Sequence, residues 1–340
     1  LTITDLKSAK ELKSSLDKLK KFKSIKYVLG EHRLEDFKNA DMILQPGNVP
    51  TDSPYLAEAK KNNIPVFVSE SLFFQHLPAG VKTIGVTGTR GKSTTTQLVY
   101  EILNLDSQGR SLGNFGSRKD RPSVFLAGNV KNVSTLALLG KVKMGDIVVM
   151  ELDSWALHGM GKIKQSPHIS VFTNLMVDHQ NFYKSMDAYF ADKANIFLYQ
   201  KNDDSLVCGQ EVLKLIQKKY KKYSGRAIVP DSGILGLPES KWKIKLLGEH
   251  NRQNIAYAVT VARILDVPEK TIKKAVESYK GVSGRLEFIK EIKGIRYYND
   301  TTATTPEAVL VALKALKTGL KTVGGIVLIS GGTDKALEYK

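Results

Sequence analysis

The sequence between residues 83 and 96 combines a strand, a glycine-rich turn and the start of a helix. It reads TIGVTGTRGKSTTT, and an apolar-periodic stretch that includes Leu98 and Ile102 follows it. A phosphate-binding loop requires this order of elements. Glycines 88 and 91 let backbone N–H groups converge on phosphate oxygens, Lys92 can reach the outer phosphates, and the Ser93 hydroxyl can bind Mg²⁺. The stretch therefore predicts an α/β fold with a nucleotide-binding loop.

The loop departs in one position from the usual glycine-lysine pattern, because Val86 stands where the first glycine is expected. The alternative interpretation is a glycine-rich turn that caps the following helix through Ser93 and Thr94. Strand, glycines, lysine and helix all agree with the phosphate loop, so we favour that interpretation.

Composition excludes several classes of protein. A length of 340 residues predicts two or three domains, and no apolar run reaches the 18 residues of a membrane span. No secretory signal opens the chain, and a single cysteine, Cys208 in a short apolar run, predicts a buried strand residue in a reducing compartment. The net charge is +17, but the lysines are scattered along helix faces, which argues against nucleic-acid binding.

Alternating strands and helices divide the chain into three segments, which predicts parallel sheets. The third segment has too few strands to cover a sheet, so we expect the chain to be a fragment. The expected strands are 1–4, 27–29, 42–44, 66–68, 83–87, 147–150, 169–173, 286–292, 295–298 and 326–330, and the expected helices are 8–20, 92–104, 187–200, 211–222, 250–265 and one after Pro306.

Carboxylate, imidazole and lysine side chains follow the central strands. Glu151 ends an apolar strand beside the phosphate loop, where a Mg²⁺ ligand belongs, although a solvent-facing strand end is the alternative. Asp178 and His179 could orient a divalent ion or form a surface pair. Lys193 has the spacing of an exposed helical lysine, which indicates a structural role.

Three further motifs are ambiguous when taken singly. Asn251 and Asn254 share one face at a helix start and could bind a purine or cap the helix. Asn299 and Asp300 precede a threonine-rich stretch that is typical of a helix start. The same stretch could equally bind a ribose or a phosphate. Residues 331–335 form a glycine-rich loop with a lysine, which could bind an anion or be only a turn.

Taken together and in this order, the motifs resemble the Mur ligase family. The resemblance spans nearly the whole chain through residues 4–7, 85–93, 151–152, 173–179, 248–254, 285 and 299–300. It implies a UDP-substrate-binding Rossmann-like domain (1–80, lacking its first strand), a central P-loop ATPase domain (81–280) and an incomplete Rossmann-like amino-acid-binding domain (281–340). The chemistry it implies is ATP-dependent amide formation through an acyl phosphate, in cytoplasmic peptidoglycan precursor synthesis. The family member most like this chain joins D-glutamate to UDP-N-acetylmuramoyl-L-alanine.

The resemblance also implies roles for individual residues. ATP would be held by Gly88, Thr89, Gly91, Lys92, Ser93, Thr94, Asn251, Asn254, Arg285 and Asp300. Two Mg²⁺ ions would be bound by Ser93, Glu151, His179 and Lys193, with Lys193 carbamylated, and the catalytic residues would be Lys92, His179 and Lys193. The nucleotide-sugar substrate and D-glutamate would contact Asp5, Lys7, Pro46, Gly47, Asn129 and Lys335.

The chain departs from the family pattern in three places. Asp153 and Ala156 stand in the expected substrate wall where a serine and a glutamine are expected, and Thr302 replaces a lysine. The alternatives are therefore another Mur ligase, a folylpolyglutamate synthase, or a nucleotide-binding module without catalysis. We expect a cytoplasmic monomer that neither inserts into membranes nor binds nucleic acid.

Overall fold

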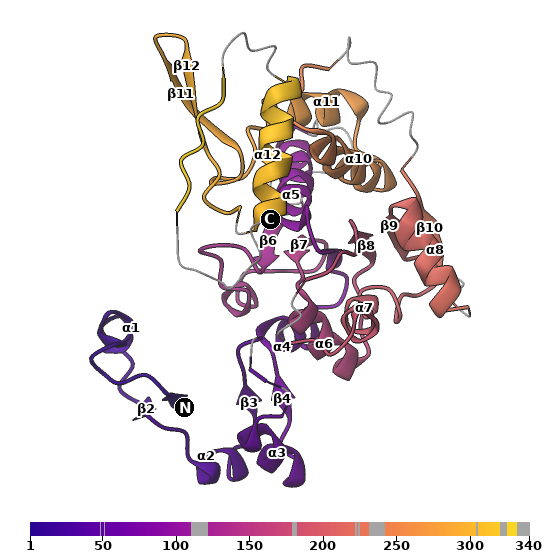
Figure 1. Cartoon of the computed structure of the whole chain (residues 1–340). Coiled ribbons are helices and arrows are strands. Elements are labelled where there is room, and N and C mark those ends of the chain that lie inside the picture. The colour runs from indigo at the N-terminus through magenta and orange to yellow at the C-terminus, as the bar shows by residue number, and fades with distance from the viewer. Residues whose placement is uncertain are drawn as a thin grey trace.

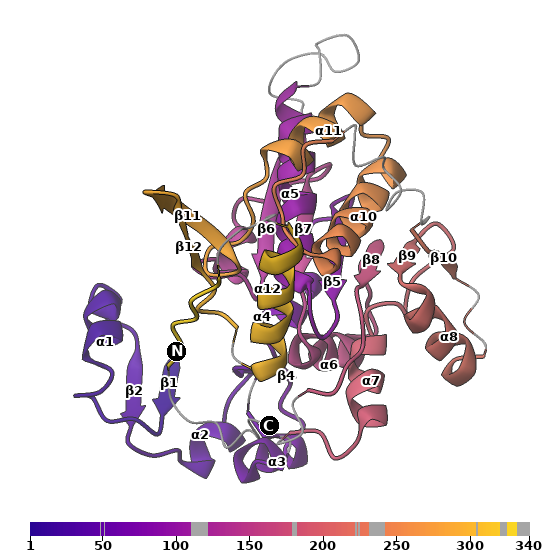
Figure 2. The same cartoon turned by 45° about the horizontal axis from the view of Figure 1, so that its top comes forward.

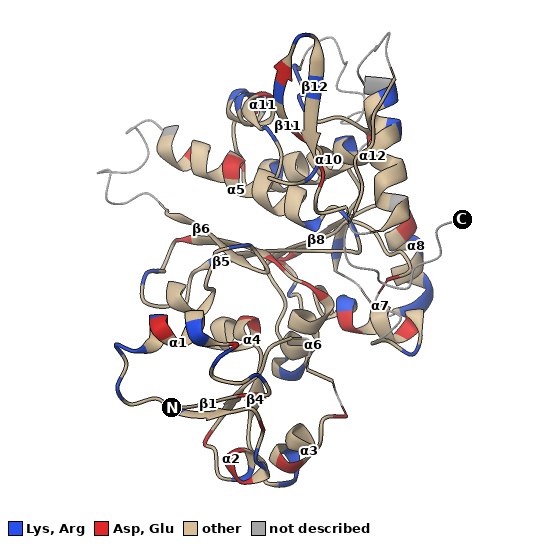
Figure 3. Ribbon diagram, turned by 60° about the vertical axis from the view of Figure 1, so that its left-hand side comes forward, with Lys and Arg blue, Asp and Glu red and all other residues tan. Residues whose placement is uncertain are grey.

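The computed structural model describes residues 1–47, 49–50, 52–109, 122–178, 182–221, 223, 225–230, 242–303, 305–319 and 325–331. A central sheet with helices on both faces forms the middle of the molecule, and the N-terminal elements lie at one end of it (Figure 1). The final helix lies in front of the central sheet in Figure 2, and Figure 3 shows it on the side of the sheet that faces away from the N-terminal elements. None of the helices in the described part of the chain has the length and apolarity needed to span a bilayer.

The central sheet has six strands that all run parallel, in the order β10-β9-β8-β5-β7-β6. Their sequences are nearly continuous apolar runs because both faces of a parallel sheet are covered by helices. This confirms the predicted parallel α/β fold and the buried strand around Cys208. The strands are β5 (Lys82–Thr87), β6 (Val124–Gly128), β7 (Ile147–Glu151), β8 (Ile169–Phe172), β9 (Ser205–Cys208) and β10 (Arg226–Ile228).

Helices cover the two faces of the sheet in separate layers (Figure 3). One layer holds α5 (Lys92–Gly109), α10 (Glu249–Ile264) and α11 (Glu269–Ser278). The other holds α4 (Ser69–Gln75), α6 (Ser154–Ile163), α7 (Met186–Ala194) and α8 (Gln210–Lys219), with the short 3₁₀ helix η2 (Leu136–Leu138) beside them.

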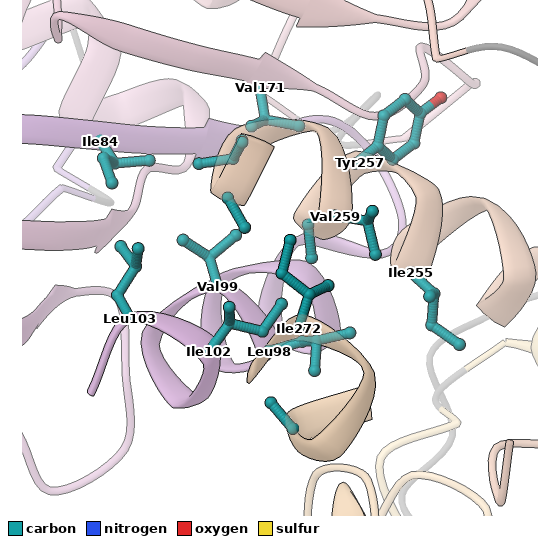
Figure 4. Packing of buried hydrophobic residues seen from close by; sticks show 14 of the residues in the cluster. Ile84, Leu98, Val99, Ile102, Leu103, Val171, Ile255, Tyr257, Val259 and Ile272 are labelled. Carbon is teal, nitrogen blue, oxygen red and sulfur yellow. The ribbon is translucent and has the colours of Figure 1, made fainter. Parts of the chain in front are cut away.

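The hydrophobic core on the α5 side fixes the direction of that helix. Val99 and Leu103 of α5 lie toward Ile84 of the sheet, while Leu98 and Ile102 lie beside α11 (Figure 4). These α5 residues recur at helical spacing and are almost completely buried. The packing holds the N-terminus of α5 at the carboxyl end of β5.

The N-terminal segment forms two small parallel β-α-β units. In the first, α1 (Lys13–Leu19) joins β1 (Thr2–Asp5) to β2 (Lys26–Leu29), and α2 (Leu34–Lys38) follows. In the second, α3 (Pro54–Lys61) joins β3 (Ile43–Leu44) to β4 (Val66–Phe67). The expected parallel pairing is confirmed, but the strands form two separate pairs in place of one sheet.

The C-terminal segment contains an antiparallel hairpin, β11 (Glu287–Ile292) and β12 (Ile295–Asn299), and then α12 (Pro306–Gly319). The strand expected at 326–330 is wrong, because these residues are irregular and find no partner strand among the described residues. The expected helix at 187–200 ends at Ala194, and the chain continues in turns in which the amides of Ile196 and Phe197 donate to carbonyls three residues earlier. The expected elements did not include strands β6 and β10 or helices α2, α3, α4, α6 and α11.

Removing the Ile102 side chain should destabilise the fold through its α5 core. Ile102→Ala leaves a cavity in a cluster where the side chain is fully buried, so we expect a loss of about 2–5 kcal/mol in the free energy of unfolding. Met144→Ala is the control, because that side chain is 79% exposed and should change stability by less than about 0.5 kcal/mol. Denaturant unfolding measures both, and equal losses would contradict the described packing.

Candidate functional site

The carboxyl ends of three neighbouring strands create the candidate site. Strand β5 lies between β7 and β8, and the chain visits β6 and β7 on one side before it crosses to β8 and β9 on the other. Loops leave such a position in opposite directions, which opens a crevice at the sheet edge. Residues 88–91 leave β5, Glu151 ends β7, and Thr173 with Asn174 follows β8.

Two glycines shape the loop between β5 and α5. Gly88 and Gly91 have φ of +141° and +83°, a region that favours glycine. A Cβ on Gly88 would lie 2.0 Å from the Thr173 hydroxyl, and one on Gly91 would lie 2.3 Å from Asn254 Oδ1. Neither position has room for a side chain, so the loop can pass this close to Thr173 and Asn254 only with glycine at both positions.

The segment after β8 holds the loop in place. The Thr89 amide donates to the Asn174 carbonyl at 2.9 Å, and the Arg90 amide donates to Asn174 Oδ1 at 2.9 Å. The Thr173 hydroxyl donates to the Arg90 carbonyl at 2.6 Å, and Tyr257 of α10 donates to the Thr173 carbonyl at 2.8 Å. We did not expect Thr173 or Tyr257 to support the loop from the sequence, since their role depends on contacts more than 80 residues apart.

Lys92 folds back over the loop that precedes it. Its Nζ donates to the carbonyls of Gly88 at 3.1 Å and Thr89 at 3.0 Å. Burial lowers the pKa of Lys92, and the nearby Arg285 guanidinium lowers it further, while Glu151 and Asp153 oppose the shift. An ammonium group beside the N-terminus of a helix fits the charge of a nucleotide phosphate.

Glu151 lies next to this lysine and is only 4% exposed. Burial raises the pKa of Glu151, against the opposing effects of Lys92 and of a hydrogen bond from Ser93. The Ser93 hydroxyl also accepts from Arg285 Nη2 at 3.3 Å. A carboxylate beside a hydroxyl is the donor set that Mg²⁺ prefers. Among the described residues, however, no three His, Cys, Asp or Glu side chains gather around a potential metal site.

Lys193 is buried, so its expected place on an exposed helix face is wrong. The side chain is 1% exposed, and its Nζ donates to the Gly88 carbonyl at 3.0 Å and to Thr87 Oγ1 at 3.3 Å. The same nitrogen lies 4.8 Å from the centroid of the Tyr189 ring. Burial, reinforced by the charge of Lys92, lowers the pKa of Lys193 to about 7. The unmodified amine is therefore no ligand for a cation while protonated, but its neutral form is nucleophilic enough to react with carbon dioxide.

Asparagines from α10 complete the loop side of the site. Asn254 is 5% exposed, and its Nδ2 donates to Asn251 Oδ1 at 3.2 Å. Asn251 Nδ2 in turn donates to the Leu247 carbonyl at 2.8 Å, so both amides are oriented at the helix start. The structure thus brings Asn254 against Gly91, as a phosphate-loop neighbour.

The C-terminal segment also reaches the loop. Arg285 contacts Ser93, and Arg90 Nη2 donates to Thr305 Oγ1 at 3.3 Å. Asp300 accepts from the Leu286 amide at 2.9 Å, and burial raises the pKa of Asp300. Thr302, which stands where the family pattern has a lysine, donates to the Gly284 carbonyl at 2.7 Å and so has a local structural role.

The residues expected around the substrate lie in several places. The Asn129 amide donates to the Glu151 carbonyl at 2.8 Å, so Asn129 adjoins the site, and Gly47 packs against Trp155 of α6. Asp5, which accepts from the Lys7 amide at 2.8 Å, is the last residue of β1, and β1 lies apart from β5 (Figure 2). His179 and Lys335 lie outside the described residues.

Asp153 begins α6 as its N-cap. Its carboxylate accepts from the Ala156 amide at 2.8 Å, which satisfies a free donor of the first turn. The two residues that depart from the expected pattern are therefore joined to each other. The negative charge of Asp153 also acts on Lys92 and Lys193, where it partly opposes the lowering of the pKa of both amines by burial.

Known proteins share this architecture and sequence. Residues 86–262 match the family model described as Mur ligase middle domain. The chain is 31% identical to the UDP-N-acetylmuramoylalanine–D-glutamate ligase of Roseiflexus sp. and 33% identical to the enzyme of the same name from Borreliella burgdorferi. Each alignment covers 100% of this chain and 73% of the relative.

Two solved structures show a similar fold. The UDP-N-acetylmuramate-alanine ligase MurC of Thermotoga maritima has a TM-score of 0.56 at 20% identity, covering 93% of this chain and 71% of that chain. The MurF ligase of Thermotoga maritima in complex with ADP has a TM-score of 0.53 at 17% identity, covering 83% and 75%. At these identities the similarity concerns the fold alone.

Adding a methyl group to Gly88 should disrupt the loop. Gly88→Ala forces a Cβ onto the Thr173 hydroxyl and strains a backbone conformation that costs a non-glycine residue on the order of 1–3 kcal/mol. We expect at least a tenfold loss of ATP affinity by calorimetry, because the backbone N–H groups shift. Gly140→Ala is the control, since a Cβ there meets nothing within 4 Å, and equal affinities of the two variants would contradict the loop geometry.

The buried Lys193 should make stability depend on pH. Its pKa is about 7 in the folded protein and near 10.5 when unperturbed, so between these values the unfolded chain holds a proton that the folded chain has released. The free energy of unfolding should therefore increase as pH rises from 7 to 10, by at most about 1.4 kcal/mol per pH unit from this group. Denaturation of Lys193→Met in metal-free, bicarbonate-free buffer should show a smaller slope, and parallel slopes would contradict the burial.

Proposed function

Because the chain belongs to the Mur ligase family of ATP-dependent amide ligases, we propose that it joins D-glutamate to UDP-N-acetylmuramoyl-L-alanine in peptidoglycan precursor synthesis. One observation supports the site of this reaction above the others. Lys92 and Lys193 both approach the Gly88 carbonyl, with Glu151 beside Lys92, where the strand ends form a crevice. Relatives whose alignments cover 100% of this chain and 73% of their own length bear the name of the D-glutamate ligase.

The proposed reaction has two chemical steps. A carboxylate oxygen of the L-alanine residue attacks the γ-phosphorus of ATP, and ADP leaves as the acyl phosphate forms. The D-glutamate amine then attacks the acyl carbon, gives up its proton, and displaces inorganic phosphate as the amide forms. Because every participant is anionic, the enzyme contributes mainly charge neutralisation and alignment.

The residues around the loop divide this work. In this proposal the phosphates bind at the loop and at the N-terminus of α5, and Lys92 neutralises charge on the transferred group. The residues of this phosphate site are Gly88, Thr89, Gly91, Ser93 and Thr94. In this proposal Ser93 and Glu151 hold one Mg²⁺, which would polarise the γ-phosphate when bound. Asn251, Asn254, Arg285 and Asp300 would contact the nucleotide.

A second Mg²⁺ would use His179 together with Lys193 in carbamylated form. Carbamylation turns the amine into an anion, and the lowered pKa of Lys193 supports this step because carbon dioxide reacts with the neutral amine. His179 would also help orient the substrate. His179 is proposed here from the sequence resemblance alone.

The substrate side of the proposal rests on fewer contacts. Asn129 lies beside Glu151 and would face the muramoyl-alanine, while Gly47 packs against Trp155 of α6 and Pro46 directly precedes it. Asp5 and Lys7 would contact the uridine diphosphate, and Lys335 the D-glutamate carboxylate. We propose the same three domains as the family, with residues 1–80, 81–280 and 281–340 contributing to them, and a monomer that acts in the cytoplasm.

Phosphate release tests the proposed function. In a full-length protein, phosphate should appear only when ATP, Mg²⁺, UDP-N-acetylmuramoyl-L-alanine and D-glutamate are all present. Lys92→Ala should lower kcat by about 10²-fold or more, because it removes a charge from the transition state. Lys82→Ala is the control, since that lysine is exposed at the opposite end of β5.

Other outcomes identify the competing functions. Turnover with another amino acid but not with D-glutamate would refute the acceptor, and turnover with a folate would indicate a folylpolyglutamate synthase. ATP binding without any acceptor-dependent turnover would indicate a nucleotide-binding module.

A further inference from the structure

Asp192, the residue before Lys193 on α7, uses both carboxylate oxygens in contacts with other elements. His158 Nδ1 of α6 lies 2.9 Å from Oδ1, and the Tyr183 hydroxyl donates to Oδ2 at 2.9 Å. Tyr183 precedes α7 and is largely buried. A charged acceptor makes stronger hydrogen bonds than a neutral one, so this pair of contacts ties α7 both to α6 and to its own leading segment.

The same tyrosine also supports Lys193 through its ring. The Tyr183 and Tyr189 ring centroids lie 5.0 Å apart, and the Tyr189 ring lies 4.8 Å below the Lys193 amine. Tyr183 therefore contacts Asp192 with its hydroxyl and Tyr189, the aromatic neighbour of Lys193, with its ring. Two independent contacts converge on the end of α7 that presents the lysine.

Helices α6 and α7 approach closely at this end. Gly161 of α6 has no room for a side chain, because a Cβ would lie 2.6 Å from Asn195 Nδ2. Asn195 Nδ2 donates to the Asp192 carbonyl at 3.1 Å, so the backbone of Asp192 is held as well as its side chain. A helix of nine residues is too short to be stable alone, so such contacts determine its position.

We propose that Asp192, held by His158 and Tyr183, is a positioning residue that keeps the Lys193 amine at the Gly88 carbonyl. The inference rests on the proposed function in one respect, since it assumes that Lys193 serves the reaction. Asp192 itself acts only through Lys193 and α7. A displacement of about 1 Å at a reacting group can lower a rate by about 10²-fold, so loss of this clamp should affect turnover.

The accessibility of the Lys193 amine tests the positioning directly. Acylation by sulfosuccinimidyl acetate in bicarbonate-free buffer, followed by peptide mass spectrometry, reports whether the amine is buried. In the wild-type protein Lys193 should be protected. We expect Asp192→Ala to raise its rate of acylation at least about fivefold and to lower kcat by about 10- to 100-fold. The KM for ATP should stay within about twofold, since the loop contacts remain.

Three further variants separate positioning from a general loss of structure. Tyr183→Phe removes one hydroxyl and keeps the ring, so it should fold even if Asp192→Ala does not. It should show a smaller change in the same direction. Asp192→Asn keeps an oxygen for Tyr183 and an amide for His158, so Lys193 should keep most of the protection from acylation that Asp192→Ala loses. Asp187→Asn breaks the ion pair of α7 with Lys219 at the other end of the helix and should leave Lys193 protected.

The outcomes are distinct. Unchanged acylation and kcat in folded Asp192→Ala or Tyr183→Phe would overturn the proposal, and so would an equal effect of Asp187→Asn. Wild-type protein without D-glutamate-dependent turnover would refute the proposed function, while the acylation rates would still decide the placement of Lys193.

Discussion

Two lysine nitrogens donate to one carbonyl oxygen, and much of the site depends on this convergence. Lys92 Nζ lies 3.1 Å and Lys193 Nζ 3.0 Å from the Gly88 oxygen. The two amines come from different helices and are both largely buried, and the positive charge of Lys92 adds to burial in lowering the pKa of Lys193. A bound anion would relieve this repulsion. The two amines at one carbonyl therefore favour the binding of an anion such as a polyphosphate at the loop.

The topology of the sheet makes the convergence possible. Strand β5 supplies the loop, β7 supplies Glu151, and β8 supplies the Thr173–Asn174 segment that holds the loop from below. Helices α5 and α7 lie on opposite faces of the sheet, and their lysines reach the same carbonyl around its edge (Figure 3). The apolar layers on both faces fix these helices, so the core of the fold determines the geometry of the site.

Sequence patterns predicted the features that depend on local order. The strand, loop and helix around Lys92, the parallel sheet and the buried Cys208 strand are confirmed, and so is the family. Lys193 was placed wrongly from spacing, because the groups that accept hydrogen bonds from its amine, on Thr87 and Gly88, lie 106 and 105 positions earlier in the chain. Residues 326–330 have the composition of a strand, but composition cannot supply a partner. The contacts of Thr173 and Asp192 depend on tertiary structure and leave no signal in the sequence.

We propose that the loop, Glu151 and the two lysines form one site for a nucleotide and its metal. A crystal structure of the full-length protein with Mg²⁺ and a non-hydrolysable ATP analogue tests it most directly. We expect the phosphates at residues 88–93, with Lys92 turned from the carbonyls of Gly88 and Thr89 toward the outer phosphate and Mg²⁺ between Ser93 and Glu151. A nucleotide bound elsewhere, with Lys92 still on those carbonyls, would contradict the account.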